Sequence, residues 1–125
     1  YAPTCFMKIK KEVFEKVGLM DEKYFVYYDD SDFIYRTNEN GYKIVYFPKA
    51  VVAHKVSVST GGSESLFFIY YVTRNRIYFI RKNLPFIYKL ISLPYFFLTR
   101  MVKYKSYNQE QRKTLIKAIK DSFKL

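Results

Sequence analysis

Charge is distributed unevenly along this chain, and this division constrains the fold more than any single motif does. Residues 1–64 contain nine Lys or Arg and nine Asp or Glu, so this half is neutral. Residues 65–125 contain 13 Lys or Arg against two acidic residues, Glu110 and Asp121, and carry the whole net charge of +11. The pattern predicts a neutral segment, residues 1–64, joined to a basic and aromatic segment, residues 65–125.

The composition restricts the class of protein further. Half of the 125 residues are apolar, with 14 Tyr and 12 Phe but only 4 Gly and 4 Pro, which excludes collagen-like, low-complexity and disordered chains. A single cysteine, Cys5, excludes an internal disulfide framework and a Cys-rich zinc module, so the expected compartment is reducing or at least one in which thiols do not matter. Residues 1–11 lack the pattern of a signal peptide, and the absence of an initial Met leads us to expect a piece of a longer protein.

The neutral half is predicted to contain two helices and two strands. Lys10–Val17 has the apolar spacing of an amphipathic helix, with Gly18 at the stop position. A second helix is expected to begin at the acidic residues 29–32, because Asp side chains cap free N–H groups, and to end near Asn40-Gly41. The apolar runs 43–47 and 50–54 then predict two short strands, separated at Pro48.

The basic half is predicted to be helical. The expected helices cover residues 66–82, 86–104 and 108–124. Asn108 is the expected cap of the last helix, with Gln111 as its returning partner. A membrane span over residues 84–102 is disfavoured, because a span needs about 20 apolar residues and Lys89 and Pro94 interrupt the run. A helix lying in the membrane interface and a helix packed in a protein core stay equally open.

Three carboxylates within four residues are the first chemical signal. Asp29, Asp30 and Asp32 follow an aromatic run, and close carboxylates can form an acid–base or metal site because their repulsion raises at least one pKa. The alternative is a solvated acidic turn that caps a helix. Asp30-Ser31-Asp32 also fits the Asp-x-Asp pattern of metal–diphosphate sites, which is too short to be specific. His54, the only histidine, is either a metal ligand or an ordinary packed or surface residue.

Taken in order, several stretches of the chain resemble family-2 glycosyltransferases. The similar stretches are Glu12–Phe33, Arg36, Gly41–His54, Tyr70-Tyr71 and Arg74–Arg76, at spacings that match the pattern of the family. The resemblance covers about residues 4–83 and is closest to the rhamnosyltransferase-like branch that acts in surface polysaccharide assembly. An ordered combination of this kind is far more specific than any one of its motifs.

The resemblance implies a role for each matching residue. Asp30 falls on the general base of an inverting transfer, and Asp29, the second predicted catalytic residue, stands where the family usually has Glu. Asp32 is expected to bind substrate, cap the helix or orient Arg36. Arg74 would approach the donor diphosphate or the acceptor. His54 matches a histidine that completes a divalent-metal site in some relatives, with Mn²⁺ or Mg²⁺ as the expected ion and the other ligands in an N-terminal half that nothing here matches.

The resemblance also implies a fold and a reaction. The fold would be α/β, with residues 1–64 as the C-terminal, acceptor-side part of a GT-A domain with few short strands, followed by about three basic helical segments. The reaction would be inverting sugar transfer from a nucleotide-sugar donor to a glycan or lipid-linked acceptor in cell-surface polysaccharide synthesis. It would take place in the cytoplasm or at the inner face of the cell membrane. Because the nucleotide-binding half is not matched, the isolated chain is expected to be inactive.

A second class of function stays open beside the enzyme. Lys and Arg interleaved with Tyr and Phe over residues 66–105 could form a binding module without catalysis, for a membrane surface or for single-stranded nucleic acid. Nucleic acid is the less favoured partner, because base-stacking platforms usually lie on a sheet and this stretch has helical spacing. Basic helices that are merely solvated on one side are the plainest alternative.

Overall fold

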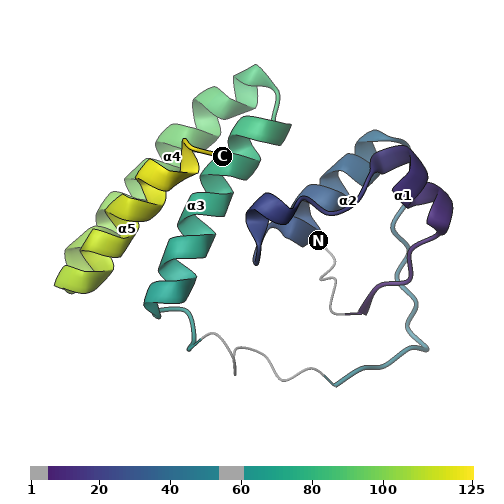
Figure 1. The fold of residues 1–125 in the computed structure, drawn as a ribbon, viewed down its shortest axis with the longest axis horizontal. Coiled ribbons are helices and arrows are strands. Elements are labelled where there is room, and N and C mark those ends of the chain that lie inside the picture. The colour runs from purple at the N-terminus through teal and green to yellow at the C-terminus, as the bar shows by residue number, and fades with distance from the viewer. Residues whose placement is uncertain (1–5, 54–60) are drawn as a thin grey trace. The chain divides into compact units, whose positions relative to one another are not determined.

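A computed structural model describes residues 6–53 and 61–125, and in these ranges all regular structure is helical (Figure 1). The elements are α1 (Lys11–Val17), the 3₁₀ helix η2 (Glu22–Tyr24), α2 (Asp29–Glu39), α3 (Leu66–Asn83), α4 (Phe86–Ser106) and α5 (Gln109–Ser122). The chain divides into two compact units, residues 1–56 and residues 57–125, which are described separately. None of the helices in the described ranges is long and apolar enough to cross a membrane.

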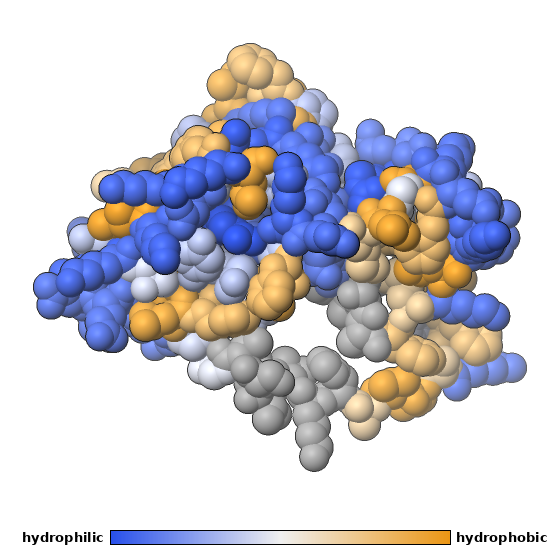
Figure 2. All heavy atoms as spheres, in the orientation of Figure 1, coloured by the Kyte–Doolittle hydropathy of each residue, from blue (hydrophilic) through white to orange (hydrophobic). Residues whose placement is uncertain are grey.

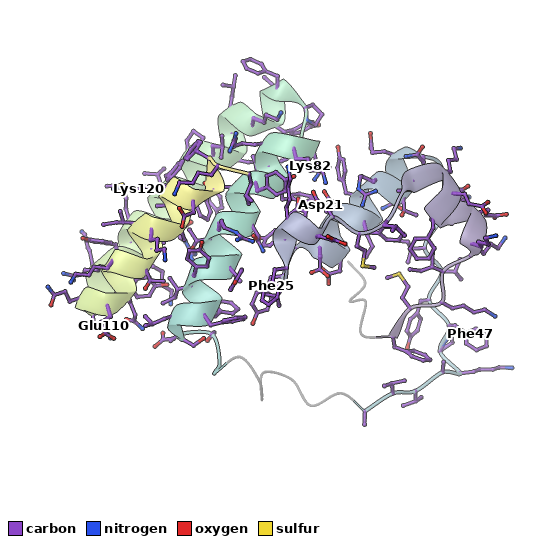
Figure 3. The ribbon with its side chains drawn as sticks, in the orientation of Figure 1. Asp21, Phe25, Phe47, Lys82, Glu110 and Lys120 are labelled. Carbon is purple, nitrogen blue, oxygen red and sulfur yellow. The ribbon has the colours of Figure 1, made fainter. Side chains whose placement is uncertain are left out.

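The predicted α/β class is wrong, because the described residues contain no strand. Residues 43–53 form an irregular segment with one turn at Pro48-Lys49, although their apolar runs have the composition of strands. A strand is stable only when its backbone pairs with a neighbour, and no second strand lies beside this segment in the described ranges. Val45, Tyr46 and Val51 are accordingly 81%, 85% and 89% exposed, and Phe47 is exposed on the same segment (Figure 3).

The two helices predicted in the first unit are confirmed. The helix α1 ends at Gly18, whose φ of 83° is a conformation that suits glycine, and α2 is followed by Gly41 with φ 81°. The rings of Phe14 and Phe33 lie 5.3 Å apart and pack α1 against α2. The first unit is thus a small pair of helices in which the acidic residues 29–32 begin the second helix.

The three helices predicted in the second unit are also confirmed, together with the cap of the last one. The Asn108 side chain accepts from Gln111 N–H at 2.9 Å, and the Gln111 side chain accepts from Asn108 N–H at 3.0 Å, which completes a capping box. The Ser65 hydroxyl caps α3 by accepting from Phe68 N–H at 3.1 Å.

The helices α3 and α5 run parallel, and α4 returns between them in the chain (Figure 1). Contacts at both ends fix this direction: Gln111 Nε2 donates to the Glu64 carbonyl at 2.9 Å, and Arg81 Nη1 donates to the Ser122 carbonyl at 2.7 Å. The apolar core between them consists of Ile69, Tyr107, Leu115 and Ile119. Tyr70 donates from its hydroxyl to Asp121 Oδ2 at 3.0 Å beside this core.

Candidate functional site

A strained aromatic turn precedes the acidic residues of the first unit. Phe25, Tyr27 and Tyr28 have positive φ values of 64°, 60° and 68°, which large L-residues rarely adopt. At Phe25, with ψ −53°, the N–H of Val26 donates to the carbonyl of Tyr24 at 2.8 Å, so these three residues form a γ-turn of the strained type. Each such conformation costs on the order of 1–3 kcal/mol and persists only where the surrounding structure holds it.

Hydrogen bonds on either side hold this turn in place. Asp21 caps η2 by accepting from Lys23 N–H at 3.0 Å, so Asp21 and Phe25 flank this short helix (Figure 3). Tyr24 is fully buried and donates from its hydroxyl to Asp32 Oδ1 at 3.1 Å. The N–H of Asp32 donates to the Tyr28 carbonyl at 2.8 Å, which closes the first turn of α2. Residues 29 and 30, which directly follow the turn, are therefore the first two residues of α2.

Asp29 and Asp30 occupy this helix start side by side and are both half-buried. Asp30 Oδ1 accepts from the Ser31 N–H at 2.7 Å and from the Ser31 hydroxyl at 3.3 Å. Burial, and then the nearby charge of Asp30, raise the pKa of Asp29 above its ordinary value of 3.8. Two adjacent carboxylates thus have different environments, and the positive end of the α2 dipole lies beside both.

Asp32 is the third carboxylate, and its surroundings are those of a structural residue. It is fully buried, and its Oδ2 accepts from Arg36 Nε at 2.8 Å, so the predicted orientation of Arg36 by Asp32 is confirmed. Arg36 also donates to the carbonyls of Val17 and Leu19, at 2.6 and 2.9 Å. This ion pair therefore ties the end of α1 to the middle of α2 and supports the turn between them.

Arg74 lies in the second unit, on α3, and its guanidinium is stacked on aromatic rings. It lies 4.9 Å from the ring centre of Tyr71 and 5.6 Å from that of Tyr70, and its Nε donates to Asn75 Oδ1 at 2.8 Å. The structure thus brings Asp29, Asp30 and Asp32 together on α2 and places Arg74 on a separate helix.

The expected metal site, in which His54 would join ligands from an N-terminal half, is not tested by the part of the chain that the structure describes. No group of three or more His, Cys, Asp or Glu side chains that could hold a metal ion occurs there. His54, the predicted ligand, lies outside the described residues. The predicted Mn²⁺ or Mg²⁺ therefore stays a prediction.

Sequence reasoning missed the strained turn and the role of Tyr24. No glycine lies between Gly18 and Gly41, so nothing in the letters indicates three positive φ values at aromatic residues. The run of aromatic residues gave one signal for the role of Tyr24. A tyrosine that becomes buried needs a hydrogen-bond partner for its hydroxyl, and Asp32, eight residues after Tyr24, is that partner in the structure.

Comparison with known proteins gives partial matches. The chain is 40% identical over 58 residues to the N-acetylglucosaminyl-diphospho-decaprenol L-rhamnosyltransferase of Mycobacterium tuberculosis, in two strains. This match covers 46% of the chain and 19% of that protein. The chain is also 32% identical over 73 residues to the low-salt glycan biosynthesis hexosyltransferase Agl10 of Haloferax volcanii, over 58% of the chain and 24% of that protein. No protein-family model and no solved structure matches.

These matches support a relationship to glycosyltransferases, one of which is a rhamnosyltransferase. The chain spans about a fifth to a quarter of the length of the curated relatives it matches. The relationship is therefore partial, and the roles of individual residues stay predictions.

Proposed function

We propose that this chain is part of an inverting, family-2-like glycosyltransferase. The enzyme would transfer a sugar from a nucleotide-sugar donor to a glycan or lipid-linked acceptor in cell-surface polysaccharide synthesis. Two glycosyltransferase names among the partial relatives support the class of reaction. The proposal places the reaction in the cytoplasm, at the inner face of the cell membrane when the acceptor is lipid-linked.

The observation that carries this proposal is the strained turn that ends at two carboxylates. Residues with strained backbones cluster at functional sites, and three strained aromatic residues lie within four positions of Asp29. A rigid helix start is a better support for a reactive carboxylate than a loop, because it fixes the direction of the side chain. The ion pair of Asp32 with Arg36, which also binds the carbonyls of Val17 and Leu19, supports that helix.

In the proposed reaction Asp30 is the general base. Its carboxylate takes the proton of an acceptor hydroxyl while that oxygen forms a bond to the anomeric carbon of the donor sugar. The bond from that carbon to the diphosphate breaks at the same time, and the electron pair leaves with the nucleoside diphosphate. The Ser31 N–H and hydroxyl both donate to Asp30 Oδ1 and would hold the carboxylate in one orientation during the proton transfer.

Asp30 is proposed as the base rather than Asp29 because the resemblance places that role at position 30 and because Ser31 orients its carboxylate. We propose that Asp29 contacts the acceptor as a hydrogen-bonding group, while Asp32 acts as a positioning residue. Arg74 is kept as the candidate cation for the donor diphosphate, with the flat face of its guanidinium held by Tyr71.

The test measures release of nucleoside diphosphate from a panel of nucleotide sugars by the protein that contains this segment, with and without Asp30→Asn. This change keeps the shape of the side chain and an oxygen that accepts from Ser31, but it removes the base. We expect a loss of about 10²–10⁴-fold in turnover, the range that general bases contribute.

Glu39→Gln is the matched control, because it removes one carboxylate from the exposed end of the same helix. Its turnover should stay close to that of the parent protein. If Asp30→Asn were as active as Glu39→Gln, Asp30 would be only a residue of the helix start and the assignment of the base would be wrong.

A further inference from the structure

The helix α4 exposes most of its surface although that surface is apolar. Only Phe96 is buried among its 21 residues, at 1% exposure. The exposed apolar residues of α4 are Phe86, Ile87, Tyr88, Leu90, Ile91, Tyr95, Leu98, Met101, Val102 and Tyr104. Ten large apolar side chains in contact with water on one helix are far more than the scattered exposure of an ordinary surface.

These side chains form one continuous arc. At 3.6 residues per turn they cover about 200° of the circumference of the helix. Over residues 86–104 the middle of the arc is aliphatic, with Ile87, Ile91 and Leu98 following one another along its axis, and Lys105 lies at the same angular position in the last turn. The two edges are aromatic, with Phe86 and Tyr104 on one side and Tyr88 and Tyr95 on the other. We call this surface the α4 arc.

The side of α4 opposite the α4 arc packs on α3, so the arc faces away from α3. The guanidinium of Arg76, on α3, lies 5.4 Å from the ring centre of Phe96, and Arg100 lies 5.6 Å from the same ring. Phe96 is thus fixed between two cations on the packed side of the helix. Within the described residues 61–125 all the side chains of the arc are exposed, so this part of the bundle does not cover the arc.

The charge of the second unit indicates what kind of surface would cover the arc. Residues 65–109 contain no Asp or Glu, and the half that includes them carries the net charge of +11. Hydrophilic side chains dominate the face over α5, and apolar ones gather at the end of the bundle where α3 joins α4 (Figure 2). A partner must therefore offer an apolar layer to the arc and negative charge around it.

We propose that the α4 arc is inserted into the interface of an anionic lipid bilayer, with the helix parallel to the membrane plane. Aliphatic side chains in the middle of the arc would enter the acyl region, and the tyrosine hydroxyls at its edges would lie at the level of the headgroups. Lipid phosphates and anionic headgroups supply the negative charge. A protein partner fits less well, because the centres of protein interfaces favour aromatic and Arg side chains, and here the aromatic residues stand at the rim.

This binding does not depend on the proposed reaction, and it is tested with the whole chain on vesicles. One set of vesicles contains phosphatidylcholine alone, and the other contains about 30% phosphatidylserine. The variant is Ile91→Glu with Leu98→Glu, which places two charges in the middle of the arc at exposed positions, so that folding is not disturbed. The matched control is Val45→Glu with Val51→Glu, which changes the net charge equally at exposed positions of the first unit.

We expect the parent chain to sediment with the anionic vesicles, and the Ile91/Leu98 variant to lose at least about tenfold in partition coefficient. The Val45/Val51 control should stay within about threefold of the parent, because it alters only the long-range charge. Equal losses in both variants would mean that charge alone attracts the chain and would overturn the proposal. So would a chain that ignores vesicles but sediments as a dimer that the arc variant dissociates, because the arc would then cover a second copy.

Discussion

The replacement Asp32→Asn gives a sharp test of how the acidic turn is held. Asp32 is fully buried, and its two oxygens accept from the Tyr24 hydroxyl at 3.1 Å and from Arg36 Nε at 2.8 Å. Asn has the same shape and its oxygen can still accept from Tyr24, so the change removes the charge and puts an NH₂ donor where Oδ2 accepted from Arg36 Nε. Arg36 is left with only the carbonyls of Val17 and Leu19.

The magnitude follows from the burial of the two partners. Removing one partner from a buried ion pair costs about 3–5 kcal/mol. The Arg36 side chain is 21% exposed and keeps two carbonyl acceptors, so part of its charge stays solvated or bonded. We therefore expect the opening free energy of α2 to fall by about 2–3 kcal/mol, or roughly 30- to 150-fold in the opening equilibrium.

Hydrogen exchange of the α2 backbone amides is the appropriate assay, because it reports the local opening of each segment. Circular dichroism would be dominated by the longer helices of the second unit. Protection of the amides from Phe33 to Thr37 should fall in Asp32→Asn, while Glu39→Gln, which removes an exposed carboxylate from the same helix, should leave it unchanged. If Asp32→Asn and Glu39→Gln exchanged at equal rates, the pair would not hold the turn.

Two further outcomes are expected in the second unit, each measured by denaturant unfolding. Hydrogen bonds from Lys124 and Tyr70 hold the pKa of Asp121 below its ordinary value of 3.8, so this carboxylate stabilises the fold above that pH and ceases to do so as the pH falls through its lowered pKa. Asp121→Asn should therefore be less stable than the parent at neutral pH, and the difference should vanish once the pH has fallen below the lowered pKa of Asp121; a constant difference would contradict this. Asn108→Ala should lower the free energy of unfolding by about 1 kcal/mol, because it removes the cap of α5. Asn108→Ser should keep most of that free energy, because Ser also caps helices.

The helices of this chain could be predicted from sequence because their signals are local. Gly18 and Gly41 follow the ends of α1 and α2, and Asn108 with Gln111 marks the start of α5. Each signal acts within one turn of the helix, so no knowledge of the rest of the fold was needed. The orientation of Arg36 by Asp32 was predictable for the same reason, since the two residues are four positions apart on one helix.

The strands were wrongly predicted and the turn was missed because both depend on contacts with distant parts of the chain. The run 43–47 has strand composition, but composition specifies a surface that suits a sheet and not the neighbour that completes it. The positive φ values at residues 25, 27 and 28 are likewise set by tertiary contacts, such as the burial of Tyr24, which override what these residues prefer. The sequence therefore identifies the carboxylates of the candidate site but does not predict the turn that positions them.

The apolar run of α4 shows where this limit matters for function. Its sequence left a core helix and an interfacial helix equally open, because both need the same spacing of apolar residues. In the structure Phe96 is the only buried residue of α4 and the aliphatic residues are exposed, which supports the interfacial helix without testing it. If the α4 arc lies in a bilayer, its basic surroundings are part of the same surface, because a charge of +11 without acidic residues over 65–109 would repel most basic partners and attract anionic lipid. The concentration of positive charge in residues 65–125 would then be explained by the binding of this half to an anionic membrane surface.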